Sequence, residues 1–124
     1  MDKSLYERLG GAAGIARLVD DVVEAHMNNP LIKARFLPFR DEPDRLAKAK
    51  KHLRDFLGMG SGGSEQYSGR NMLDTHRGMN ISAQEYMAAM DDILGTLERH
   101  KIDEQTRKDV LAIAYSLKGE IIHV

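Results

Sequence analysis

The chain has 124 residues, of which 42% are hydrophobic and 30% are charged, and this composition is typical of a single folded domain spanning residues 1–124. Its 18 basic and 19 acidic side chains lack the basic excess of a nucleic-acid-binding protein. The absence of cysteine excludes disulfide bonds, thiolate metal sites and a cysteine nucleophile. No apolar run approaches the ~20 residues that cross a bilayer and no signal-peptide pattern is visible, so we expect a cytoplasmic protein without a membrane partner.

The N-terminal part of the chain predicts a very short helix followed by a long one. Ser4 and Glu7 have the spacing of a capping box, and Gly10 and Gly11 are expected to end the first helix. From Gly14 onward, apolar residues recur every three or four positions, which predicts a second helix ending at residues 28–30. Its buried face is expected to hold Ile15, Leu18, Val19, Val22, Val23, His26 and Met27.

A third helix is predicted from Pro43 to about Leu57, after the short apolar segment 31–39. Its inner face is expected to hold Leu46, Ala49, His52, Leu53 and Phe56. The following segment, residues 58–69, contains five of the eleven glycines and is interpreted as a flexible connection. Residues 70–77 then allow about two helical turns before Gly78.

Two further helices are predicted in the C-terminal part. Ser82 and Glu85 form a second capping-box pattern, which opens a helix that is expected to bury Tyr86, Met87, Met90, Ile93, Leu94 and Leu97. A last helix from about Glu104 is expected to present Val110, Ile113, Ala114, Leu117 and Ile121. Because no segment shows useful two-residue alternation, the pattern indicates an all-α domain.

Two of the five histidines, His52 and His76, lie on predicted apolar helix faces. Histidines in such positions are usually structural, either hydrogen-bonded or half-exposed. Two imidazoles that face one apolar cavity from two helices would instead suit a haem, which takes one nitrogen ligand on each face. The sequence shows no paired histidines at zinc-binding spacing, no nucleophile elbow and no phosphate-binding loop, so no catalytic residues are predicted.

Four segments in order resemble the truncated haemoglobins, most closely group I, over nearly the whole chain. They are Leu5-Tyr6-Glu7-Arg8-Leu9-Gly10-Gly11, His52-Leu53-Arg54-Asp55-Phe56, Tyr67-Ser68-Gly69-Arg70-Asn71-Met72, and His76 with Gly78 and Ile81. The resemblance implies a two-over-two helical sandwich around haem b (iron protoporphyrin IX). It implies that His76 is the proximal iron ligand, oriented by Asp74 or by a backbone carbonyl.

The distal side departs from the family pattern. Val23, preceded by Val22, stands where the family usually has a tyrosine, and Ala49 and Leu53 stand where glutamines are common. A donor to bound dioxygen is worth about 1–2 kcal/mol, so its absence predicts faster dioxygen release. His52 matches a position from which some members bind iron directly, and we expect it to coordinate iron when no gas is bound. The alternative is that His52 turns toward a haem propionate or solvent.

The resemblance also implies a set of residues that line the haem, although methionines and tyrosine at helical spacing more often belong to an ordinary core. The set comprises Val23, Phe36, Phe39, Ala49, Leu53, Phe56, Met72, Met79, Ile81, Tyr86 and Met90, with either Phe36 or Phe39 wedging the haem. Gly119 replaces the histidine by which some relatives attach haem covalently. His26 is interpreted as a buried structural residue. The basic residues Lys48, Lys50, Lys51 and Arg54 are interpreted as a solvated face, with an ion pair between one of them and a haem propionate as the alternative.

Binding of dioxygen, nitric oxide or carbon monoxide is the function that this resemblance implies. One alternative is a haem enzyme that converts nitric oxide to nitrate or turns over peroxide or nitrite. Another is electron transfer or redox sensing through an iron held by two histidines, with a reductase as partner. A haem-free helical interaction module is the alternative from a different class.

Overall fold

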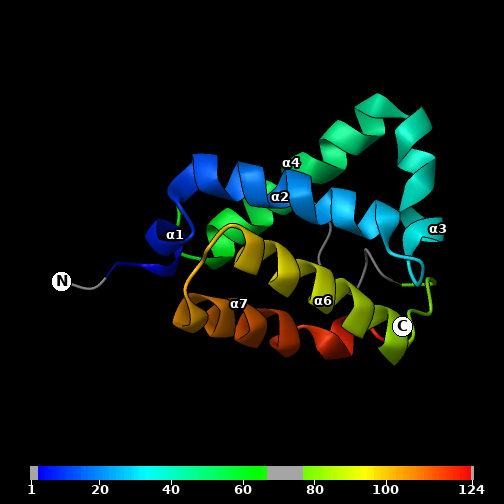
Figure 1. Ribbon diagram of the computed structural model, residues 1–124. Coiled ribbons are helices and arrows are strands. Elements are labelled where there is room, and N and C mark those ends of the chain that lie inside the picture. The colour runs from blue at the N-terminus through cyan, green and yellow to red at the C-terminus, as the bar shows by residue number, and fades with distance from the viewer. Residues whose placement is uncertain (1–2, 67–76, 124) are drawn as a thin grey trace.

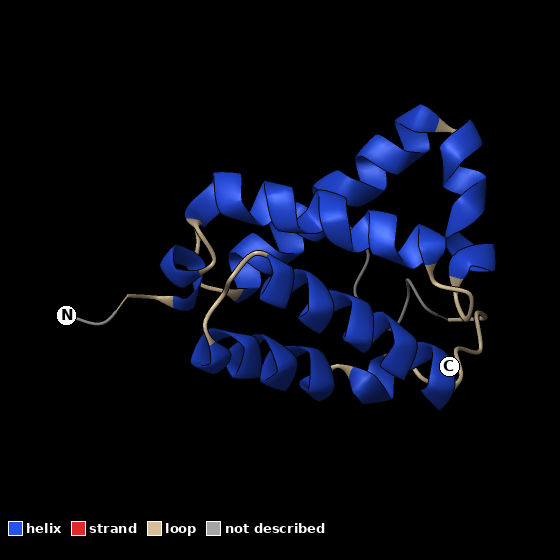
Figure 2. Ribbon diagram, in the orientation of Figure 1, coloured by secondary structure: helices blue, strands red, loops and turns tan. Residues whose placement is uncertain are grey.

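The computed structural model describes residues 3–66 and 77–123, and the regular elements of these residues are helices joined by loops and turns (Figures 1 and 2). An isolated parallel bridge between Ile81 and Ile122 is the only β-type pairing among these residues. The predicted all-α fold is therefore confirmed. The elements are α1 (Leu5–Arg8), α2 (Gly11–Asn28), α3 (Lys33–Phe36), the 3-10 helix η1 (Leu37–Asp41), α4 (Pro43–Gly60), α6 (Ala83–Arg99), α7 (Glu104–Ser116) and the 3-10 helix η2 (Lys118–Glu120).

The long helices form two pairs. Helix α2 packs against α4, and α6 packs against α7 (Figure 1). Helix α2 also packs against α6, which joins the two pairs into the predicted two-over-two sandwich. The core lies where α2 meets its neighbours: Val19 is fully buried, and Leu97 of α6 and Val110 of α7 belong to the same apolar cluster.

Local capping signals predict the helix starts correctly. The Ser4 hydroxyl accepts a hydrogen bond from the Glu7 backbone N–H at 3.1 Å. At the start of α6, the Ser82 hydroxyl accepts from the Glu85 N–H at 3.0 Å, and the Glu85 carboxylate accepts from the Ser82 N–H at 3.2 Å. Both helix starts therefore follow directly from serine and glutamate three residues apart.

Three details of the prediction are wrong. Helix α2 begins at Gly11, not at Gly14, because Gly10 turns the chain in a left-handed conformation with φ of 96° and lets the next helix start at once. Helix α4 continues through Gly58 to Gly60, so it occupies the first part of the segment interpreted as flexible. Met87 is 53% exposed and lies on the outer side of α6, where the helical period alone placed it inside.

The rest of the glycine-rich segment, as far as residue 66, is packed against α1. The Tyr6 backbone N–H donates to the Ser61 carbonyl at 2.9 Å, and the Tyr6 hydroxyl donates to Glu65 Oε1 at 2.6 Å. This hydrogen bond is the main cause of the raised pKa of Tyr6. Residues 61–66 thus form a connection that ties the end of α4 to the N-terminal helix.

Gly14→Ala is expected to destabilise the fold by about 1–3 kcal/mol, the usual cost of overpacking. Gly14 is buried in α2, and a Cβ built on it would lie 2.3 Å from the Leu9 backbone oxygen. Gly95→Ala in α6 is the matched control, because its Cβ would meet only Arg99 Nη1 at 3.6 Å. Since alanine favours helix by up to about 1 kcal/mol over glycine, the control should be neutral or stabilising. Urea unfolding of both variants measures the difference, and equal stabilities would contradict the packing described.

Candidate cofactor site

The inner face of α4 forms one wall of the candidate site. Its predicted members, Leu46, Ala49, His52, Leu53 and Phe56, are all half-buried, and Gly58 is the only fully buried residue of this 18-residue helix. Among the described helices, α4 packs mainly on α2 and η1, and any contacts with α6 or α7 are sparse. Burial of apolar surface contributes about 25 cal/mol per Å² to stability, and apolar side chains that stay partly accessible lack part of this contribution. A group that covered this face of α4 would supply it. A flat, largely apolar group such as haem fits this wall.

Helix α6 supplies two of the predicted lining residues from the second pair of helices. Tyr86 and Met90 are buried. The Tyr86 hydroxyl donates to the Ala114 carbonyl of α7 at 2.7 Å, and burial raises the pKa of Tyr86. Tyr86 therefore remains a neutral donor that fixes α6 against α7, and its ring contributes apolar surface.

The chain that leads into α6 is anchored to the C-terminal end. Ile81 is half-buried, and its carbonyl accepts from the His123 backbone N–H at 3.0 Å. The exposed His123 ring nitrogen Nδ1 lies 3.1 Å from Asn80 Oδ1. Met79 is 37% exposed, and its carbonyl accepts from Arg35 Nη2 at 3.1 Å.

Phe36 and Phe39 lie together in the turn between α2 and α4. Their ring centroids are 6.4 Å apart, and both half-buried rings pack against the apolar core. The Phe36 ring lies 5.0 Å from the His26 ring, whereas the Arg45 guanidinium lies 4.9 Å from the Phe39 centroid. The two candidate wedge residues thus have different surroundings: Phe36 contacts the α2 core and Phe39 contacts the start of α4.

The structure describes one of the two predicted iron ligands. His52 is half-buried on α4, beside Leu53 and in the middle of the apolar face. His76 lies outside the described residues, and so do Met72 and Asp74. Val23 is 8% exposed and belongs to the core cluster on α2. Coordination by His52 and His76 and the lining roles remain predictions.

His26 is a buried structural histidine, as predicted. It is 7% exposed, and its Nδ1 lies 2.7 Å from Asp92 Oδ2 on α6. Asp92 was missed in the sequence, where it is one of two adjacent aspartates in a helix. It lies one turn after the buried Ala88 and is itself half-buried, and a carboxylate on such a face indicates a polar contact with a neighbouring element.

A second ion pair that the sequence did not predict ties α3 to the start of α6. Arg35 donates to both carboxylate oxygens of Glu85, with Nη2 to Oε1 at 3.2 Å. The hydrogen bonds from Arg35 lower the pKa of Glu85 to about 2. The pair therefore stays ionised above that pH and holds the turn that contains Phe36 and Phe39 against α6.

The basic residues of α4 divide into two groups. Lys48 is exposed, and Lys51 is 61% exposed at its side chain and pairs with Asp55 within the same helix, as expected for a solvated face. Lys50 instead reaches Asp20 of α2 at 3.3 Å, and Arg54 is half-buried. The solvated-face interpretation is therefore wrong for Lys50, which links the two helices of the first pair.

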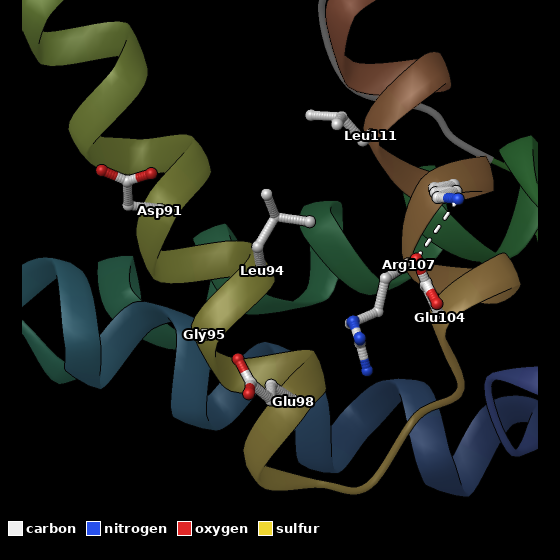
Figure 3. A pocket seen from close by; sticks show the side chains of 8 residues that line it. Asp91, Leu94, Gly95, Glu98, Glu104, Arg107 and Leu111 are labelled. Carbon is white, nitrogen blue, oxygen red and sulfur yellow. Dashed lines mark ion pairs between the residues drawn. The ribbon is translucent and has the colours of Figure 1, made fainter.

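A surface groove of about 430 Å³ runs between α6 and α7 (Figure 3). Its apolar floor carries Leu94 and Leu111, and its rim carries charges of both signs, including the Lys108–Glu104 pair at 3.3 Å. Its lining residues are Asp91, Leu94, Gly95, Glu98, Glu104, Arg107, Lys108 and Leu111, none of which belongs to the predicted haem-lining set. The groove is a feature separate from the candidate site.

Two crossed pairs of helices, with an apolar wall on α4 and a histidine in its middle, define a two-over-two globin. The chain belongs to the bacterial-like globin family, whose sequence model matches residues 4–123. The predicted resemblance to truncated haemoglobins is confirmed.

Curated relatives support the same assignment. The group 1 truncated hemoglobin GlbN of a Synechocystis species is 29% identical over 115 residues, which cover 90% of this chain and 89% of the relative. The group 1 truncated hemoglobin of Tetrahymena thermophila is 29% identical over 119 residues, which cover 87% and 94%.

Solved structures agree on the fold. The Fe(III) form of truncated hemoglobin from Tetrahymena pyriformis superposes with a TM-score of 0.88 at 21% identity and covers 98% of this chain and 100% of that one. The 2/2 hemoglobin of a Synechococcus species has a TM-score of 0.77 at 26% identity, with 94% of each chain covered. As a separate observation, none of the described helices is both long and apolar enough to cross a bilayer.

Proposed function

We propose that this chain binds haem b between α4 and the α6–α7 pair and uses it to bind dioxygen, nitric oxide or carbon monoxide. The observation that carries the proposal is the half-buried inner face of α4, whose main packing partners in the described chain are α2 and η1, with at most sparse contacts to α6 or α7. Truncated haemoglobins are the relatives that this fold and sequence match.

In this proposal His76 holds the iron on the proximal side, and the bound haem supplies an iron coordination position for a diatomic gas. His52 occupies that position in the absence of gas, because the apolar side chains beside it, such as Leu53, offer no competing ligand. The apparent affinity for a gas is then the intrinsic affinity multiplied by the fraction of molecules in which His52 has moved away.

We further propose that the haem is held without a covalent bond to the protein. The Synechococcus relative is described with covalently attached heme. Gly119 stands at the position where the resemblance places the attaching histidine, and a glycine has no side chain to form such a bond. Denaturation in acidified organic solvent should therefore extract the haem from this protein completely.

Leu53→Glu tests the apolar wall directly. A carboxylate on this face would have to be desolvated beneath the haem, so titration of apo-protein with ferric haem should show affinity reduced on the order of tenfold or more. Leu31→Glu is the matched control, because Leu31 is 53% exposed and the same substitution there should change nothing. Circular dichroism should show that both variants remain helical. If folded Leu53→Glu bound haem as tightly as the unmodified chain, the proposed location would be wrong.

A further inference from the structure

We propose that the outer face of α6 and α7 is a contact surface for a second copy of this chain, and that two copies associate there as a two-fold symmetric bundle of four helices. We call this surface the α6–α7 face. It consists of the groove in Figure 3 together with Met87 and Tyr115, which lie beyond its end. The inference goes beyond the proposed function and does not depend on haem.

The first observation is that apolar side chains continue along the outside of these two helices. Met87 of α6 is 53% exposed, and Leu111 and Tyr115 of α7 are 37% and 60% exposed. They are three of the six large hydrophobic side chains that are exposed in the described chain. The half-buried Leu94 lies between the two helices in the groove (Figure 3). An exposed apolar face with a charged rim is typical of a protein–protein contact.

The second observation is that both helices carry this face at the same spacing. The Tyr86 hydroxyl donates to the Ala114 carbonyl at 2.7 Å, which sets position 87 of α6 beside position 115 of the antiparallel α7. Along α6 the face then holds Met87, Asp91, Leu94 and Glu98. Along α7, in the reverse direction, it holds Tyr115, Leu111, Lys108 and Glu104. Because each set advances by four, three and four residues, it stays on one side of its helix, as the seam of a helix bundle requires.

Charge selects how two such faces fit together. Among the residues that line the groove, the charges of α6 are the acids Asp91 and Glu98. Helix α7 contributes Arg107 and Lys108 together with Glu104, which pairs with Lys108 at 3.3 Å. A two-fold axis perpendicular to the helices would place α6 on α6 and bring the acids of the two copies together. An axis parallel to the helices places α6 of each copy on α7 of the other, where acidic and basic side chains meet.

The matched spacing determines which side chains meet in this arrangement. Rotation about an axis parallel to the helices leaves the height of each residue unchanged. Met87 therefore faces Tyr115 of the second copy at one end of the contact. Lys108 lies at the height of Leu94, which is between Asp91 and Glu98, so its long side chain can reach either acid of the second copy. The arrangement thus combines an apolar contact with ion pairs across the interface.

The size of the face predicts a weak dimer. From residue 87 to residue 98 it is about 18 Å long, and two adjacent helices are about 20 Å wide. The surface buried on both copies together is then on the order of 1,000 Å², at the lower limit for a specific contact. The net charge of -1 adds little general repulsion between copies. We therefore expect a dissociation constant of about 10–100 μM at low salt.

Sedimentation equilibrium of the full chain measures this association. Leu111→Glu should raise the dissociation constant on the order of tenfold or more, because the contact would have to bury a carboxylate. Leu31→Glu is the matched control: Leu31 is 53% exposed outside the α6–α7 face, and its substitution should leave association unchanged. Circular dichroism should show that both variants remain helical. An unmodified chain that stayed monomeric up to about 1 mM would overturn the proposal, and so would a Leu111→Glu variant that dimerised normally.

A charge exchange tests the pairing of α6 with α7. Lys108→Glu alone, and the double variant Asp91→Lys/Glu98→Lys alone, each bring like charges together across the contact, so each dissociation constant should rise on the order of tenfold. An equal mixture of the two should form a mixed dimer, since opposite charges then meet in both halves of the contact. If the mixture did not associate, the proposed pairing would be wrong. Because sedimentation reads protein mass, a failure of haem binding would contradict the proposed function and leave this inference standing.

Discussion

Replacing His76 with alanine should abolish stable haem binding. If His76 is the proximal ligand, its removal breaks the main bond that fixes the iron, and only the proposed bond from His52 and apolar contacts such as those of Leu53 would remain. Removing a residue that hydrogen-bonds to a metal ligand typically lowers metal affinity by about 10–100-fold. Removing the ligand itself should cost at least as much, so we expect haem affinity to fall by on the order of a hundredfold or more. Titration of apo-protein with haem, followed by absorption, measures this change.

His123→Ala is the control for that experiment. His123 is exposed and contacts Asn80 near the end of the chain, so its removal should leave haem affinity and spectrum unchanged. Added imidazole should partly restore the spectrum of His76→Ala, because it replaces the missing nitrogen ligand. If His76→Ala retained haem with an unaltered spectrum, another residue would have to be the proximal ligand.

His52→Ala should convert a low-spin ferric spectrum into a high-spin one. In the proposed unliganded state, two imidazoles give a strong ligand field, and loss of one leaves a weakly bound or open position. The same variant should also bind carbon monoxide faster than the unmodified protein. The ratio of the two binding rates should equal one divided by the fraction of unmodified molecules in which His52 has left the iron. Absorption spectra and flow-mixing with carbon monoxide give the two readouts.

His100→Ala is the control for His52→Ala, because it removes a histidine that does not lie on α4. It should leave the spin state unchanged, since His100 pairs with Asp21 at the end of α6. A high-spin ferric spectrum of the unmodified protein near neutral pH would show that His52 does not coordinate the iron. His52 would then be assigned to a propionate or to solvent.

Much of this fold is encoded in short-range spacing. The eight buried residues of α2 include the seven that the periodicity predicted. The Ser4 cap of α1 and the Ser82–Glu85 capping box of α6 both follow from serine and glutamate three residues apart. All five residues predicted for the inner face of α4 are half-buried for the same reason. Helical period and caps involve neighbours along the chain, so they can be read without knowledge of the tertiary structure.

Contacts between distant residues could not be predicted in this way. His26 and Asp92 are 66 positions apart, and Arg35 and Glu85 are 50 apart, so no local pattern connects them. Met87 fits the apolar period of α6 yet is exposed. The face of a helix that becomes buried depends on which other elements pack against it, and the sequence of the helix does not show this. The placement of His76 came from the family resemblance and from no pattern of spacing.

The most direct test of haem binding is the absorption spectrum of protein purified from cells supplied with haem, recorded in the ferric, ferrous and carbon monoxide-bound states. We predict a Soret band corresponding to one haem per chain, which shifts when carbon monoxide binds the ferrous protein. A folded, helical protein without a Soret band, even with haem supplied, would contradict haem binding and favour a haem-free interaction module.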